Sequence, residues 1–278
     1  MKPLEPIFVV ELFPKIEAKL VEVLRLLNVE EWEQRTVAPQ WRVKDVAAHL
    51  LDTNLRKLSM VRDGYFGESP GRVDSYQDLV EFLNRLNADW VQAMKRVSPR
   101  LITNLLEWSA PLVYEFTRGL DPMAQASFSV AWAGEDKSLN WFDIAREYTE
   151  RWHHQQQIRL AVGKPGIETR ELYHPVLDTF VRALPHGYRD VEAAEGTVMV
   201  LEIDGEAGGK WFLVRMNRHW ELSSQADRTP EASVVIPQEI AWRVFTKGVD
   251  RESALKRSRI SGERRLGEHL FGVLAVMA

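Results

Sequence analysis

The chain has 278 residues, a length that suits one or two domains and can bury a core without covalent staples. It contains no cysteine, which excludes disulfides, thiolate metal ligands and a nucleophilic cysteine of its own. Its 36 Lys and Arg against 40 Asp and Glu give a net charge of −4, which argues against nucleic-acid binding. The N-terminus lacks the features of a signal peptide, and no apolar run approaches the ~18 residues of a membrane helix. We therefore expect a soluble, cytoplasmic protein with no membrane partner.

The first 165 residues have the apolar spacing of helices separated by irregular loops. Long helices are predicted over residues 11–28, 43–62, 75–94 and 143–162. Ser75 has the character of a helix N-cap, and a shorter helical stretch is predicted from Ser98-Pro99 towards Leu112. Residues 120–140 show no clean period, which predicts a long ordered loop. Four long helices with modest connections predict a four-helix bundle.

The sequence pattern changes after residue 166. Helices are predicted over residues 169–184, 237–245 and 263–276, and Pro185 is expected to end the first of them. Alternating apolar and polar residues predict strands over residues 198–203, 211–215, 220–222 and 232–236. The sequence therefore predicts an α+β fold, with a four-helix bundle in residues 1–165 and a small mixed α/β domain in residues 166–278.

Tryptophan is abundant, at 10 residues, and seven of these lie before residue 160. Each tryptophan buries a large area and needs one partner for its N–H group. We expect these side chains mainly in the core, with a role in lining a site as the alternative for one or two.

Several common catalytic signatures are absent from the sequence, among them G-x-S-x-G, H-E-x-x-H and G-x-G-x-x-G. Glu150 and His154 lie one turn apart in the predicted helix over residues 143–162, so both side chains can reach one point. His49 borders the apolar face of the helix over residues 43–62, so its imidazole can face the bundle interior. Facing helices of bundles build metal sites from such carboxylates and histidines.

Three nitrogen and oxygen ligands leave a fourth position for water, the arrangement of a catalytic zinc site. Two alternatives stay open at this point. Glu150 and His154 can instead form a surface pair that bridges in water. His153, three residues from Glu150, is as polar as His154 and has a comparable spacing.

Two segments resemble a known family. The segment Trp41–Asp52 resembles the second-helix motif of DinB-type metal-binding bundles. The segment Glu150–Arg159 resembles the fourth-helix motif of the mycothiol-dependent maleylpyruvate isomerase family. That motif has a glutamate, three residues and a histidine, often followed by an aspartate, where this chain has Gln157. The resemblance implies zinc or another divalent ion on His49, Glu150 and His154.

The resemblance covers about residues 5–165. Beyond them, residues 227–236 and 260–262 resemble the sterol-carrier-protein-like domain that many such proteins carry. In the resembled isomerase a low-molecular-weight thiol binds the metal, adds to the substrate double bond and leaves after rotation. The resemblance therefore implies a zinc enzyme that uses an external thiol on a small-molecule substrate, as an isomerase or S-transferase. The alternatives are a zinc-dependent hydrolase of an amide or thiol conjugate and a non-catalytic metal- or ligand-binding protein.

Four further residues are candidates for the chemistry. Glu147, one turn before Glu150, is the nearest candidate base, although a solvated carboxylate is the favoured interpretation. A thiol cofactor that carries carboxylates or sugars would need cations, and Arg56, Arg159 and Arg243 are available. The sequence does not choose among these arginines, and it leaves the substrate, the thiol and the oligomeric state open.

Overall fold

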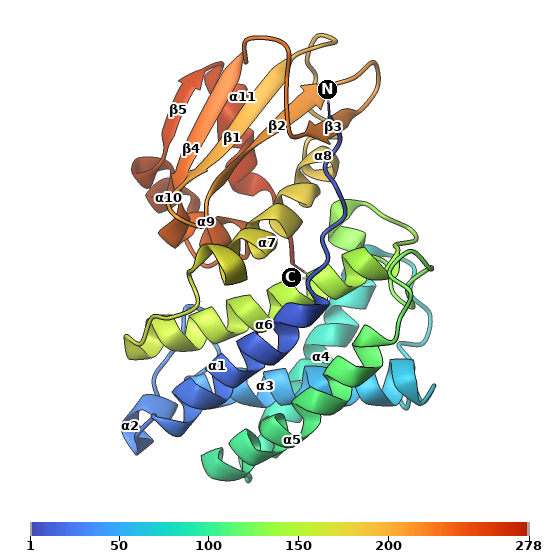
Figure 1. The fold of residues 1–278 in the computed structure, drawn as a ribbon, viewed down its shortest axis with the longest axis vertical. Coiled ribbons are helices and arrows are strands. Elements are labelled where there is room, and N and C mark those ends of the chain that lie inside the picture. Colours follow the sequence, from blue (N-terminus) through green and yellow to red (C-terminus); the bar gives the residue numbers. More distant parts are fainter. Residues whose placement is uncertain (1, 277–278) are drawn as a thin grey trace. The chain divides into compact units, whose positions relative to one another are not determined.

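The computed structural model describes residues 2–276 and divides into two compact units (Figure 1). The helical unit comprises Val9–Ser127 and Glu150–Ile167. The mixed unit comprises the residues up to Phe8, Phe128–Thr149 and Glu168–Val276. The chain leaves the helical unit for the last time after Ile167, next to the predicted domain boundary between residues 165 and 166. Phe128–Thr149 also belongs to the mixed unit, so the chain passes between the two units more than once and a single boundary does not separate them.

The helical unit is built from amphipathic helices. Its elements are a 3₁₀ turn at Val10–Leu12, α1 (Phe13–Arg25), α2 (Val29–Trp32), α3 (Val43–Arg56), a π-helical turn at Lys57–Arg62, α4 (Tyr76–Met94), α5 (Pro99–Arg118) and the second part of α6 (Asn140–Val162). Apolar side chains of α1, α3, α5 and α6 share one core that includes Leu24, Leu50, Leu106 and Ile158. The four predicted long helices are confirmed, and Ser75 caps α4 by accepting from the backbone N–H of Asp78.

The predicted extent of the helix after Ser98 is wrong. α5 continues past Leu112 to Arg118, so it is a long helix that packs against α1 and α3. Pro111 stands inside it and is exposed, and Val113 and Thr117 beyond it are buried. Burial of these later residues holds the helix together across the backbone hydrogen bond that proline cannot make.

A buried polar network joins the four helices of the core. The guanidinium of Arg151 on α6 donates to Glu17 Oε1 on α1 and to Asn54 Oδ1 on α3, each at 2.5 Å. Asn54 Nδ2 in turn donates to Ser109 Oγ on α5 at 2.9 Å. All four side chains are buried. The guanidinium also lies 5.2 Å from the centre of the Phe13 ring. Because each helix supplies one member, the network fixes how the helices are rotated and aligned along one another.

The mixed unit contains one five-stranded sheet in the order β3-β2-β1-β4-β5. The strands are β1 (Val198–Asp204), β2 (Gly209–Arg215), β3 (Trp220–Ser223), β4 (Ala232–Pro237) and β5 (Arg259–Gly262). β1 pairs with β4 in parallel, and every other neighbouring pair is antiparallel. The first four residues of β1, Val198–Leu201, are all buried, so this strand is covered on both faces and its burial does not follow the predicted alternation. Its helices are α7 (Arg170–Phe180), α8 (Leu184–Gly187), α9 (Gln238–Phe245), α10 (Arg251–Arg257) and α11 (Arg264–His269), with 3₁₀ turns at Ala131–Ala133, Val181–Ala183 and Leu270–Gly272.

Two predicted helix ends in this unit are wrong. Pro185 does not end the helical run, because it occupies the first turn of α8, where a missing N–H costs nothing. The final helix ends at His269 rather than at residue 276. Beyond it, the backbone N–H of Ala275 donates to the carbonyl of Phe245, so this segment bonds to the end of α9. Strand β5 was not predicted, because it has only four residues, has one apolar side chain and is held by pairing with β4.

Residues 120–140 form the predicted loop apart from the 3₁₀ turn at Ala131–Ala133, and α6 begins at Asn140 rather than at Asp143. Among the helices within residues 2–276, none has both the length and the apolar character that crossing a membrane requires.

Replacing Arg151 with Met is expected to lower the free energy of unfolding by about 3–5 kcal/mol, because Glu17 then remains buried without a partner. Replacing Glu17 with Leu in the same chain is expected to recover part of that loss. Urea denaturation followed by circular dichroism measures both effects. Arg25→Met is the matched control, since it breaks an exposed ion pair with Glu107 and should cost about 0–1 kcal/mol. Equal losses in Arg151→Met and Arg25→Met would contradict the account.

Candidate metal centre

Helix α3 presents His49 on the face next to its buried apolar side. The helix starts where Asp45 accepts a hydrogen bond from the backbone N–H of Arg42, which caps the first turn. Val46 and Leu50 bury the core face of the same helix. His49 itself is buried, so its imidazole lies within the helical unit rather than in solvent.

Helix α6 supplies two further potential ligands. Glu150 and His154 are one turn apart, and His154 Nε2 lies 3.3 Å from Glu150 Oε2. Each of His49, Glu150 and His154 offers one ligand atom, and these atoms all lie within 4.8 Å of one another. Because His154 is buried, the alternative of a surface pair bridging in water does not describe it. Of the two neighbouring histidines, His154 is the one whose ring nitrogen lies in this group.

The three residues fit a divalent metal. His49 Nδ1 is buried and has no hydrogen-bond partner among the described residues, an arrangement that costs free energy unless another group binds this nitrogen. Burial, and then the neighbouring His154, lowers the pKa of His49 well below its ordinary value, so the imidazole is neutral as a metal ligand must be. Two imidazoles and one carboxylate are a donor set that zinc accepts with one position left open.

A glutamine orients the imidazole of His154. Gln157 Oε1 lies 3.0 Å from His154 Nδ1. An amide oxygen only accepts, so Nδ1 carries the proton and the lone pair of Nε2 points to the Glu150 side. Gln157 therefore orients the imidazole of His154 through a neutral acceptor, without the charge that a carboxylate at this position would bring.

Trp41 covers the two histidines. Its ring centre lies 4.8 Å from that of His49 and 5.9 Å from that of His154, with the second pair stacked. The side chain is half-buried. The sequence predicted the tryptophans mainly in the core and left a site-lining role open for one or two of them without choosing which, and Trp41 is one that lines the candidate site. The available signal was the position of Trp41 in the segment Trp41–Asp52, just ahead of the start of α3, the helix that carries His49.

Arg56 lies two turns after His49 on α3, so it is the predicted arginine that shares a helix face with a ligand. Its Nη2 donates to Asp52 Oδ2 at 2.5 Å and to Asn87 Oδ1 at 2.6 Å. Burial raises the pKa of Asp52, against the opposing effect of Arg56. The two acceptors hold the guanidinium in place, and its charge is near enough to His49 to contribute to the lowered pKa of that imidazole.

The other predicted residues lie in different surroundings. Arg159 donates to the backbone carbonyls of Lys19, Lys164 and Pro165, which anchors the chain where α6 ends. Arg243 lies in the mixed unit, where its Nε donates to the carbonyl of Gly248 at 2.8 Å. Burial lowers the pKa of both guanidinium groups. Their predicted roles in thiol binding stay predictions.

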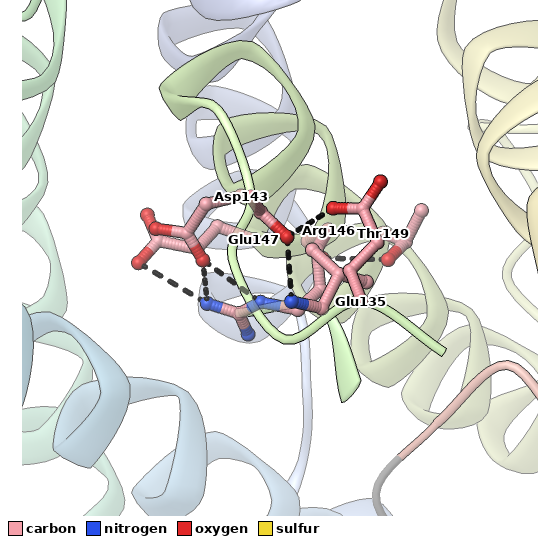
Figure 2. A network of polar contacts seen from close by, with 7 residues as sticks. Glu135, Asp143, Arg146, Glu147 and Thr149 are labelled. Atoms are coloured by element: carbon pink, nitrogen blue, oxygen red, sulfur yellow. Dashed lines mark hydrogen bonds and ion pairs between the residues drawn. The ribbon is translucent and has the colours of Figure 1, made fainter. Parts of the chain in front are cut away.

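Glu147 lies in the part of α6 that is grouped with the mixed unit. Figure 2 shows it in a polar cluster around Arg146. Arg146 Nη2 lies 2.6 Å from Asp143 Oδ1 and 3.7 Å from Glu147 Oε1. Thr149 Oγ1 donates to the backbone carbonyl of Arg146 at 2.6 Å. Glu147 is thus half-buried beside a cation rather than free in solvent, and its role as a base stays a prediction.

Comparison with known proteins establishes the family. The profile of the mycothiol maleylpyruvate isomerase N-terminal domain matches residues 13–159, slightly more than half of the chain. The chain belongs to this family. All three members of the His49–Glu150–His154 group lie inside the matched region. None of the curated proteins matches the chain.

Solved structures support the fold that the family implies. Two crystal structures of the mycothiol-dependent maleylpyruvate isomerase, one of them a histidine-to-alanine mutant, are each 13% identical with a TM-score of 0.51. Each match covers 84% of this chain and 86% of the other. This likeness confirms a helical region followed by an α/β domain. The ubiquinone synthesis protein UbiJ-SCP2 is 14% identical over 37% of this chain and 86% of its own, with a TM-score of 0.26. That score supports no argument, so the sterol-carrier-like character of the second domain stays a prediction.

Replacing either His49 or Glu150 with Ala is expected to abolish stoichiometric zinc binding, because two remaining donors do not hold the ion. His153→Ala is the matched control and should retain zinc. Elemental analysis of each variant, purified after growth with zinc, measures the content. Full zinc content in both His49→Ala and Glu150→Ala would show that the ligands lie elsewhere.

Replacing Gln157 with Leu is expected to weaken zinc binding by about 10–100-fold, because the imidazole of His154 loses the acceptor that orients it. Gln157→Asp should instead tighten binding, since a carboxylate makes the imidazole more basic. Competition with a chromophoric chelator measures both dissociation constants. If neither variant changes the affinity, residue 157 does not influence the metal.

Proposed function

We propose that the protein is a zinc-dependent enzyme that uses a low-molecular-weight thiol as cofactor or co-substrate, as an isomerase or S-transferase. The observation that carries the proposal is the convergence of His49, Glu150 and His154 within 4.8 Å in a chain that belongs to this family. When bound there, a divalent metal supplies Lewis acidity that lowers the pKa of a coordinated thiol.

The residues of the chain supply the conditions for this chemistry. The neutral His49 and the oriented His154 offer lone pairs, and Glu150 offsets part of the charge of a divalent ion. Trp41 covers one side of the histidines and limits the access of water. The reactive thiol must come from another molecule, since the chain contains no cysteine.

Arg56 is our candidate for binding an anionic group of the thiol or the substrate. Asp52 and Asn87 both bond to its Nη2, and its Nε is buried without a hydrogen-bond partner among residues 2–276. A guanidinium offers five N–H donors in a fixed plane, which suits a carboxylate.

Mycothiol and a maleylpyruvate-like substrate are the first compounds to test, because the similar crystal structures are of a mycothiol-dependent maleylpyruvate isomerase. A cytoplasmic location belongs to this proposal, since low-molecular-weight thiols are kept reduced there.

Thermal shifts of the zinc-loaded protein with mycothiol, bacillithiol and glutathione test the proposal. We expect one thiol to stabilise the protein, by about 2.7 kcal/mol at a concentration 100 times its dissociation constant. The same thiol should leave Glu150→Ala unchanged, and its S-methylated form should have little effect on the zinc-loaded protein.

The thiol that stabilises the protein should then support the cis-to-trans conversion of maleylpyruvate or a similar unsaturated acid, measured by absorbance. Failure of all three thiols to stabilise the zinc-loaded protein would contradict the proposal. That result would favour the hydrolase or the non-catalytic binding protein.

A further inference from the structure

The mixed unit contains a pocket of about 450 Å³, a size that suits a small organic molecule. We call it the α8 pocket, because α8 and the residues that follow it form one of its walls. The other walls come from the 3₁₀ turn Ala131–Ala133, the start of α10 and the segment after α11. The lining that matters below consists of Trp132, His186, Arg189, Arg251, Val273 and Leu274.

The α8 pocket is not the candidate metal centre. Every residue that lines it belongs to the mixed unit, whereas His49, Glu150 and His154 belong to the helical unit. A ligand of this pocket would therefore bind to residues for which the proposed function has no role.

Trp132 brings an unpaired donor to the pocket. Its side chain is only 6% exposed, and its ring packs edge-on against Phe142, with 5.8 Å between the ring centres. The indole N–H makes no hydrogen bond with another residue of 2–276, although a buried tryptophan usually finds a partner for this group. The nitrogen is not fully enclosed by protein either. Because Trp132 lines the pocket, its N–H is available to an acceptor bound there.

Two arginines give the pocket positive charge. Arg189 Nη1 donates to the backbone carbonyl of His186 at 2.8 Å, and Arg251 Nη2 donates to that of Glu268 at 3.1 Å. These carbonyls hold the two guanidinium groups in place. Nη2 of Arg189 and Nη1 of Arg251 make no hydrogen bond with another described residue, so each arginine keeps N–H groups for a ligand.

The nearby carboxylates only partly offset this charge. Asp190 Oδ2 lies 3.4 Å from Arg189 Nε, but the Asp190 side chain is 85% exposed. Glu268 Oε2 lies 3.8 Å from Arg251 Nη2, beyond hydrogen-bond length, and Glu268 Oε1 accepts from Arg264 Nε at 2.5 Å. Exposed pairs of this kind contribute little free energy, so an anion in the pocket can compete for both arginines.

The imidazole of His186 lies beside the turn that carries Trp132. A β-carbon at Gly134 would overlap this ring, so the glycine, with a φ of +81°, allows the turn to pack directly against α8. The ring has no hydrogen-bond partner among the described residues. Burial, and then Arg189, lowers the pKa of His186, against the opposing effect of Asp190. The neutral ring therefore adds one further N–H donor to this wall.

We propose that the α8 pocket binds a small organic carboxylate with a planar, apolar body. Trp132, Arg189 and Arg251 offer N–H groups and no acceptor, which suits a ligand whose charged group only accepts. Val273 and Leu274 add apolar surface beside these donors. An inorganic anion would leave that surface uncovered, whereas a planar organic body covers it and can lie against the indole ring.

Fluorine NMR titration of the metal-free full chain with para-fluorobenzoate tests the proposal. The probe is a planar carboxylate, and removal of the metal prevents the carboxylate from binding to zinc instead. Circular dichroism verifies that the metal-free chain is folded. We expect saturable binding with a dissociation constant of about 1 mM or below, as a ligand of this size permits. Para-fluorobenzamide has nearly the same shape without the charge and should bind about tenfold more weakly or less, since it forms no charge-assisted hydrogen bond.

Substitutions identify the pocket. Arg251→Gln and Trp132→Phe should each weaken the binding of para-fluorobenzoate by about tenfold or more, because each removes a hydrogen bond to a charged group. Arg257→Gln is the matched control, since it removes the same charge from the same helix at an exposed residue outside the pocket. It should leave the affinity unchanged. Arg251 is exposed, so Arg251→Gln decides the question even if Trp132→Phe does not fold.

Four results would overturn the proposal. They are no binding of para-fluorobenzoate, equal binding of para-fluorobenzamide, displacement of the probe by inorganic phosphate at an equal concentration, and equal effects of Arg251→Gln and Arg257→Gln. None of these results bears on the metal centre, because the titration is done without the metal.

Discussion

One buried guanidinium sets the geometry on which the helical unit depends. Arg151 bonds at once to Glu17 on α1 and to Asn54 on α3, and Asn54 continues the network to Ser109 on α5. Arg151 directly follows Glu150 in the sequence. Because successive helix residues point about 100° apart, fixing the direction of Arg151 also fixes that of Glu150. The same network holds α3 in register, and α3 carries His49. The candidate metal centre is thus a consequence of how the core polar network aligns two helices.

The centre itself combines burial with an incomplete set of hydrogen bonds. His49 is held neutral by its surroundings, and its Nδ1 has no protein partner within residues 2–276. His154 is oriented by Gln157, and Trp41 lies against both rings. Buried polar atoms are normally paired, so an unpaired imidazole nitrogen beside a carboxylate indicates a ligand that binds between them. Arg56 adds a fixed positive charge close by, which gives the site a means to hold an anion.

The sequence was sufficient to predict the elements that local periodicity determines. The helices of the core repeat apolar residues at helical spacing, and β2 buries Trp211 and Leu213 at the predicted spacing of two, so both could be predicted without a structure. The continuation of α5 past Pro111, the strand β5 and the irregular C-terminal segment depend on tertiary contacts and could not. In the site, helical spacing brought Glu150 and His154 together, but it could not separate His154 from His153, since both lie within a turn of Glu150. The family motif made that choice. Trp41 stacks on His154, and Arg56 bonds to Asn87. These residues are far apart in the sequence, so the spacing of residues within one helix could not predict either contact.

The central claim is that His49, Glu150 and His154 hold one divalent ion. Anomalous diffraction on either side of the zinc absorption edge, from crystals of the zinc-loaded protein, tests it most directly. We expect one strong peak, with two histidine nitrogens and a Glu150 oxygen at about 2.0–2.2 Å from it. The absence of a peak between these side chains, or a zinc ion bound only by other residues, would contradict it.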